Sequence, residues 1–174
     1  RSFSSEIYDV KELQEQVANF ASTMAEKARK QRSVVAEMLV FAYTNRFKEN
    51  QTQDYANELV VFITPTADQR TIIAHAIQAV NNLCKKNCGY KKAGVIATKI
   101  MAETDVMRSL FENTELVKRE NNITAAVDAI NNTFGKGTIK LAVQGSGKIK
   151  TTSENQPPHY TTRWTDIPNV TVKP

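Results

Sequence analysis

Residues that could act as nucleophiles, metal ligands or phosphate binders are few in this chain of 174 residues. The segment Gly145-Ser146-Gly147-Lys148 has part of the pattern of a phosphate-binding loop. However, Ile149 stands where that loop needs a serine or threonine, and Ala142 stands where it needs its first glycine. No Ser-His-Asp or Cys-His pairing indicates a nucleophile either. We therefore interpret the segment as a turn and predict no active site.

The two cysteines are the next candidates for chemistry. Cys84 and Cys88 are separated by three residues, but a zinc site would need two further ligands. The only histidines, His75 and His159, are far away in the sequence. The cysteines are therefore interpreted as reduced packing residues, which is typical of a cytoplasmic protein. We expect neither a metal nor a cofactor in this chain.

Positive charge is the feature that points to a partner. The net charge of +5 and the isoelectric point of about 9.2 are moderate. The charge is unevenly placed, because no acidic residue occurs between Asp68 and Glu103. The cations in this stretch are Arg70, Lys85, Lys86, Lys91, Lys92 and Lys99. Such clustering is typical of a surface that faces a polyanion, although solvated edge charges would give the same pattern.

The hydrophobic pattern of residues 1–101 predicts an α+β domain. The predicted elements, in order, are a strand at 1–7, a helix after an Asp9 cap, strands at 33–44 and 59–64, a helix after a Thr66–Gln69 capping box, and a strand at 89–100. Pro65 is expected to stop the third strand. The order β-α-β-β-α-β predicts a four-stranded sheet with two helices on one face. The cationic end of the first helix is expected to be solvated.

The other face of this sheet is expected to be open. We assign Ala93, Val95 and Ala97 to the core and their neighbours Gly94, Ile96 and Thr98 to the open face. The middle of that face should then be small and uncharged, with lysines near its margins. A sheet of this kind would allow the close approach of a polyanion backbone, and no aromatic stacking platform is evident.

The rest of the chain has a thinner core. Residues 102–121 are interpreted as a polar linker, and residues 122–174 as a small, partly ordered αβ extension. A short helix should begin at Asn122 and end at Gly135, and a strand should follow at 138–143.

Several short motifs, taken together, resemble a known family. They are Arg1-Ser2-Phe3, Thr64-Pro65-Thr66, Tyr90-Lys91-Lys92-Ala93-Gly94-Val95, Gly135-Lys136-Gly137-Thr138 and Tyr160-Thr161-Thr162-Arg163-Trp164. In this order they resemble the C-terminal part of the UmuC-type Y-family translesion DNA polymerases. The resemblance implies a little-finger DNA-binding domain at residues 1–101 and a UmuC-specific extension at 122–174. The palm, with its Mg²⁺-binding carboxylates, would precede Arg1.

The resemblance implies a non-catalytic fragment that grips the sugar-phosphate backbone of a primer-template during SOS-type DNA repair. The residues expected to contact phosphates are Arg1, Ser2, Ser4, Ser5, Arg46, Lys48, Lys91, Lys92 and Lys99. Two alternatives remain open: a protein–protein interaction module, and a free-standing nucleic-acid-binding domain that prefers RNA.

The resemblance also implies a sliding-clamp ligand at Met107, Leu110 and Phe111. The family commonly carries a Gln-Leu-x-Leu-Phe segment after the little finger. Here Met107 replaces the glutamine and Arg108 replaces the first leucine, so we expect weak binding. Alternatively, Leu110 and Phe111 pack against the chain's own helices. Other implied partners are a UmuD-type accessory subunit and a recombinase filament, in the cytoplasm near the nucleoid and without a membrane.

Overall fold

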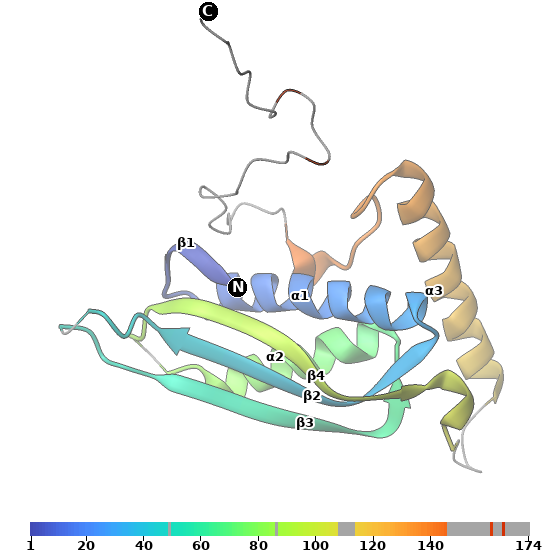
Figure 1. Ribbon diagram of the computed structural model, residues 1–174, viewed down its shortest axis with the longest axis horizontal. Helices are drawn as coiled ribbons and strands as arrows, with labels where there is room; N and C mark the ends of the chain where they lie inside the picture. Colours follow the sequence, from blue (N-terminus) through green and yellow to red (C-terminus); the bar gives the residue numbers. More distant parts are fainter. Residues whose placement is uncertain (49, 86, 108–113, 146–160, 162–164, 166–174) are drawn as a thin grey trace, which may run out of the picture.

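The computed structural model describes residues 1–48, 50–85, 87–107, 114–145, 161 and 165 (Figure 1). Its elements are β1 (Ser2–Ile7), α1 (Val10–Lys30), β2 (Ser33–Thr44), β3 (Tyr55–Thr66), α2 (Gln69–Leu83), β4 (Tyr90–Ala102), η1 (Glu103–Asp105), α3 (Thr114–Phe134) and η2 (Ala142–Gln144), of which η1 and η2 are single 3₁₀ turns.

The four strands form one antiparallel sheet in the order β1-β4-β2-β3. β1 and β2 flank β4, and β3 and β4 flank β2, so each helical connection crosses over one strand, as in a split β-α-β unit. Helices α1 and α2 pack against each other and cover the same face (Figure 1). The predicted α+β fold, with two helices on one side of a four-stranded sheet, is confirmed.

The core lies between this sheet and the two helices. Its largest fully buried side chains include Phe3 of β1, Leu13 of α1, Met38 of β2 and Ile72 of α2. On β4, Ala93 is fully buried and belongs to the same cluster. Burial of such side chains stabilises the domain by about 1.5–3 kcal/mol for each large one. The predicted assignment of the Ala93, Val95 and Ala97 set to the core face is confirmed, with Val95 and Ala97 partly buried.

Both predicted helices begin at an aspartate. The Asp9 carboxylate accepts a hydrogen bond of 2.9 Å from the backbone N–H of Lys11, which confirms it as the cap of α1. The cap of α2 is Asp68, which accepts from the N–H of Thr71 at 2.9 Å. The prediction that Thr66 caps this helix is therefore wrong. Its hydroxyl accepts instead from the N–H of Asp68, the residue just before the helix, at 3.0 Å.

The third strand is longer than the sequence predicts. It begins at Tyr55 instead of Leu59 and runs through Pro65 to Thr66. Pro65 does not stop it because β3 is an edge strand, where a residue without an N–H removes no bond from a central ladder.

The extension differs from its prediction at two points. Helix α3 begins at Thr114, more than two turns before Asn122, and ends before Gly135, whose φ of 109° is left-handed. No strand forms at 138–143, where the chain pairs with none of the four described strands and runs into the 3₁₀ turn η2. Side chains satisfy the backbone there: Asn131 Oδ1 accepts from the N–H of Ile139 at 2.8 Å.

Some predictions concern residues outside the described part of the chain. These residues are Ser146, Gly147 and Lys148 of the glycine-rich segment, Leu110 and Phe111, and Tyr160, Thr162, Arg163 and Trp164 of the tail motif. Among the described helices, none is both long and apolar enough to cross a membrane.

Candidate nucleic-acid interface

The face of the sheet opposite the helices is built from alternate residues of three strands. Because Met38, Val40 and Ala42 of β2 point into the core, Leu39, Phe41 and Tyr43 point to the open side. Directly opposite residues in an antiparallel sheet share a face, so the strand register gives three rows. The rows are Tyr55–Tyr43–Lys92, Asn57–Phe41–Gly94 and Leu59–Leu39–Ile96.

These rows make the open face aromatic at one end. The ring centroids of Phe41 and Tyr43 lie 4.9 Å apart, and those of Tyr43 and Tyr55 lie 5.6 Å apart. The prediction of a small middle without aromatic rings is therefore wrong. Gly94 does not leave an open patch, because a Cβ atom placed there would lie 2.6 Å from Cζ of Phe41. Because glycine has no side chain, the Phe41 ring can pack directly over the backbone of β4 at this position.

The sequence signal for these rings was present but incomplete. Phe41 and Tyr43 are two residues apart on one strand, which places them on one face. Their partner Tyr55 could be found only from the β2–β3 register, and the predicted third strand did not reach it.

Four of the nine predicted phosphate ligands gather at the same end of the sheet, namely Lys92, Arg46, Lys48 and Lys91. Lys92 lies opposite both Ser2 of β1 and Tyr43 of β2. Arg46 is in the β2–β3 connection, with its guanidinium carbon 4.9 Å from the centroid of the Phe47 ring. In the described part of the chain, neither Lys92 nor Arg46 has a carboxylate partner.

Two predicted ligands at this end have partners within the chain. The Lys48 ammonium lies 2.8 Å from a carboxylate oxygen of Glu6, and this hydrogen bond lowers the pKa of Glu6 and raises the pKa of Lys48. The Lys91 ammonium donates to the backbone carbonyl of Ser4 at 2.8 Å. Lys91 is an extra residue in β4 between Tyr90 and Lys92 and forms a β-bulge opposite β2. Bulges of this kind redirect the side chain of the extra residue.

The remaining predicted ligands lie at the margins. Ser2, Ser4 and Ser5 are exposed along the edge strand β1. Arg1 is exposed too, and its guanidinium lies 5.9 Å from the ring centroid of Phe20, on the side of helix α1. Lys99 is not part of the cluster. It lies opposite Glu37 toward the far end of β4, with its ammonium 3.8 Å from that carboxylate.

A buried polar network that the sequence did not predict holds the base of the β2–β3 connection. The Asp54 carboxylate, 6% exposed, accepts from the Tyr90 hydroxyl at 2.7 Å and from the Lys85 ammonium at 2.8 Å. The Thr44 hydroxyl accepts from the N–H of Asp54 at 2.9 Å. Burial raises the pKa of the Tyr90 hydroxyl, so this group stays a donor. The network fixes β2, β3 and β4 relative to one another beside the aromatic rings.

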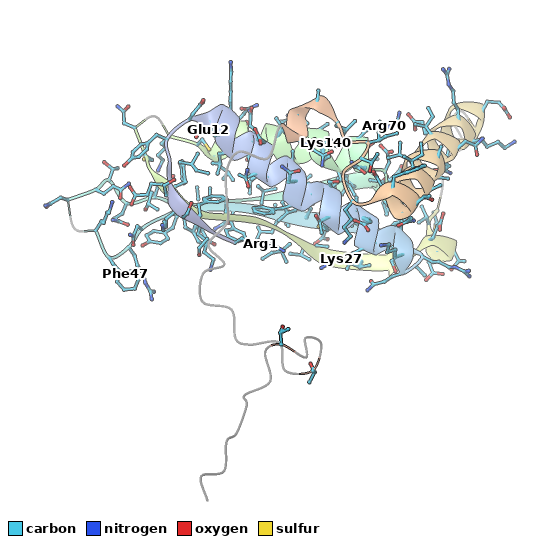
Figure 2. The ribbon with its side chains drawn as sticks, turned by 90° about the horizontal axis from the view of Figure 1, so that it is seen from above. Arg1, Glu12, Lys27, Phe47, Arg70 and Lys140 are labelled. Carbon is cyan, nitrogen blue, oxygen red and sulfur yellow. The ribbon has the colours of Figure 1, made fainter. Side chains whose placement is uncertain are left out.

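The connection itself is tied by Gln53. Its side-chain amide nitrogen donates to the carbonyls of Asn45 at 3.1 Å, Lys48 at 2.9 Å and Gln51 at 3.3 Å. Phe47, 80% exposed, is held at the protruding tip of this connection, as Figure 2 shows.

The extension meets the opposite side of the domain mainly through polar contacts, and its Leu141 packs against the hydrophobic core. The Arg29 guanidinium forms two hydrogen bonds of 2.7 Å with Asp128 of α3 and a third, of 2.8 Å, with the carbonyl of Ala67. Arg29 therefore holds the extension and is not part of the solvated helix end that the sequence predicts.

Met107, from the predicted clamp-binding segment, is 93% exposed. No group of three or more potential metal ligands occurs among the residues that the structure describes.

An α+β domain with a basic, open sheet face and a helical extension is thus defined by the structure. The profile of the impB/mucB/samB family C-terminal domain matches residues 1–110, and the chain belongs to this family. A domain of unknown function, DUF4113, matches residues 121–170.

Individual relatives agree with this assignment. Over 168 residues the chain is 29% identical to protein UmuC of Salmonella typhimurium (strain LT2), which covers 96% of this chain and 40% of the relative. It is 31% identical over 175 residues to protein MucB of Escherichia coli, covering 99% of this chain and 41% of the relative. The chain therefore spans about 40% of the length of these curated relatives. The resemblance to UmuC-type proteins that the motifs predicted is confirmed.

Proposed function

We propose that this chain is the DNA-binding, non-catalytic part of a translesion DNA polymerase and grips the phosphate backbone of a primer-template. The observation that carries the proposal is the basic end of the open sheet. Lys92 and Arg46 lie there without a carboxylate partner in the described residues, beside the exposed serines of β1. Backbone contacts position a protein on DNA without reading sequence, which suits a template with damaged bases.

In the whole polypeptide, the catalytic palm with its Mg²⁺-binding carboxylates would precede Arg1. The proposal therefore places no step of nucleotide addition in this chain. The gene sequence before Arg1 tests this part of the proposal, since it should encode a palm with paired carboxylates.

The DNA-binding role can be tested by fluorescence anisotropy with a primer-template over a series of salt concentrations. Replacing both Lys92 and Arg46 by alanine should weaken binding and reduce the log–log salt slope by about two units, roughly one for each phosphate contact. Lys11→Ala is the matched control, because Lys11 is an exposed cation on α1, on the other side of the sheet. An unchanged slope in the double variant would show that DNA does not bind this face.

We also propose a weak contact with the sliding clamp through Met107, Leu110 and Phe111. The nearly full exposure of Met107 supports it. The test is a peptide spanning Glu103 to Glu115, titrated against the clamp of the same organism beside a Leu110→Ala, Phe111→Ala version. Binding by the first peptide alone supports the contact, and equal or absent binding contradicts it. A UmuD-type subunit and a recombinase filament are further proposed partners of the whole polymerase.

A further inference from the structure

The aromatic end of the open face has a chemistry that a backbone grip does not use. Phosphate contacts need cations and hydrogen-bond donors, whereas Phe41, Tyr43 and Tyr55 form a cluster of adjacent rings on a face that no described element covers. Tyr55 is 50% exposed, and Phe47 at the neighbouring tip is 80% exposed. Rings placed like this add nothing to the core of the domain, which lies on the other side of the sheet.

The rings are also held in place before any ligand arrives. Tyr43 and Tyr55 lie on the paired strands β2 and β3. Next to them, the buried Asp54 carboxylate accepts a hydrogen bond from Tyr90 and so ties the start of β3 to β4. Phe47 is on a connection tied by three hydrogen bonds from Gln53, and its own N–H donates to Asn45 Oδ1 at 3.2 Å. A rigid arrangement lowers the entropy lost on binding.

The charge around the rings suits a nucleic acid strand. Lys92 ends the row that contains Tyr43 and Tyr55, and the Arg46 guanidinium lies over the Phe47 ring. The two rows that contain the aromatic rings include no acidic residue. A positively charged groove with aromatic side chains on which successive bases stack is the usual surface for single strands.

We propose that Phe41, Tyr43, Phe47 and Tyr55 form a stacking platform for unpaired bases of single-stranded DNA. Paired bases inside a duplex already have both faces covered by their neighbours, so a ring can stack only on a base that is unpaired. The platform rests on the proposed function and deepens it. The cations would hold phosphates, and the rings would hold the unpaired template strand next to the duplex.

The experiment compares two probes with the full chain at one salt concentration: a fluorescein-labelled single strand of 15 thymidines and a labelled blunt duplex of 15 base pairs. The variants are Phe47→Ala and Tyr55→Leu, both at exposed positions. Each should weaken binding of the single strand by about tenfold, because stacking of one base commonly contributes that much. Binding of the duplex should stay within about twofold, which also shows that the variants fold.

Two controls separate the ring from the apolar surface. Tyr55→Phe keeps the ring and should bind the single strand like the unmodified chain. Ile63→Ala removes an apolar side chain, fully exposed on the same strand and face, and should change neither probe. The platform is wrong if the single strand does not bind at low salt, or if Tyr55→Leu and Phe47→Ala weaken both probes equally or neither. Failure of the backbone grip is a different result, namely duplex binding that does not respond to Lys92→Ala and Arg46→Ala.

Discussion

Glu6 limits the charge available to DNA at the basic end of the sheet. Its side chain is 9% exposed and accepts hydrogen bonds from the Lys48 ammonium at 2.8 Å and from the Tyr8 hydroxyl at 3.0 Å. A cation held by a carboxylate contributes less to the potential that a phosphate meets. We therefore expect Lys48 to bind a phosphate more weakly than a cation without a carboxylate partner.

This gives a prediction for Glu6→Gln. Removing the carboxylate charge should release Lys48, raise the affinity for a primer-template by about two- to fivefold at 0.1 M salt and steepen the log–log salt slope by about one unit. The matched control is Glu12→Gln, which makes the same change of net charge at an exposed position on α1. Anisotropy titrations measure both. Equal effects of the two variants would mean that only net charge matters.

Cys84 gives a second prediction at the scale of one residue. Burial raises the pKa of its thiol to about 11, from an ordinary value of 9.0. The folded chain should therefore react with iodoacetamide at pH 9 more slowly than the urea-unfolded chain, since the thiolate is the nucleophile. The raised pKa also means that the stability this thiol contributes is present below pH 9 and is lost as the pH rises through about 11.

Mass spectrometry after trypsin measures the Cys84 reaction separately, because Lys85 and Lys86 lie between it and Cys88. The expected ratio of rates at pH 9 is tens-fold, in line with a pKa difference of about two units. Similar rates in the folded and unfolded chains would contradict the raised pKa of this partly buried thiol.

At the scale of elements, Asp54 links the end of β2 and the start of β3 to β4. Asp54→Ala should lower the free energy of unfolding by about 1–3 kcal/mol, because it leaves the buried Tyr90 hydroxyl without its acceptor. Lys85→Ala removes the other partner, whose side chain is 68% exposed, and should cost less than about 1 kcal/mol. Urea unfolding followed by circular dichroism compares the two. A larger effect of Lys85→Ala would show that the ion pair, and not the tyrosine, carries the stability.

The elements that the sequence predicts well are those with a strong local signal. The helix beginning after Asp9 combines an N-cap with a stripe of apolar residues, and β2 is rich in β-branched and aromatic residues; both match the structure closely. The start of β3 was missed because residues 55–58 are mostly polar and gain their strand conformation from pairing with β2. Residues 138–143 have the alternation of a strand but pair with no strand of the sheet, and the Asn131 side chain bonds the backbone of Ile139 instead.

The sequence predicted the cations of the candidate site but not the aromatic side chains beside them. The acid-free stretch revealed Lys92, and the resemblance added Arg46, yet the cluster of Phe41, Tyr43 and Tyr55 depends on strand register. Register is set by tertiary pairing over the whole sheet, so no local pattern reveals which side chains of two strands lie opposite each other. The ion pair between Lys48 and Glu6 was hidden for the same reason.

At the scale of the whole molecule, the sheet domain and the extension differ in how they are held. In the part of the chain that the structure describes, all 22 residues of the buried hydrophobic cluster lie between Phe3 and Ala93. Helix α3 has no buried residue among its described side chains and meets the domain through polar contacts. These include the Arg29–Asp128 pair and a 3.3 Å hydrogen bond from Thr124 to Asp68. We predict that residues 1–101 fold independently and that limited proteolysis first cuts between Met101 and Asn122.

The docking of α3 can be tested without truncation. Asp128→Asn weakens the bidentate contact with Arg29, whose side chain is 18% exposed, and a bond to a charged group is stronger than a neutral one. Amide hydrogen exchange in α3 should become about tenfold faster, while the melting temperature of the sheet domain should change by less than about 2 °C. Lys118→Ala is the control, because it removes a solvent-exposed ion pair within α3 and should leave docking intact.

A fall of several degrees in the melting temperature would show instead that α3 is part of one cooperative unit with the sheet domain. Unchanged exchange would show that Arg29 does not hold the extension.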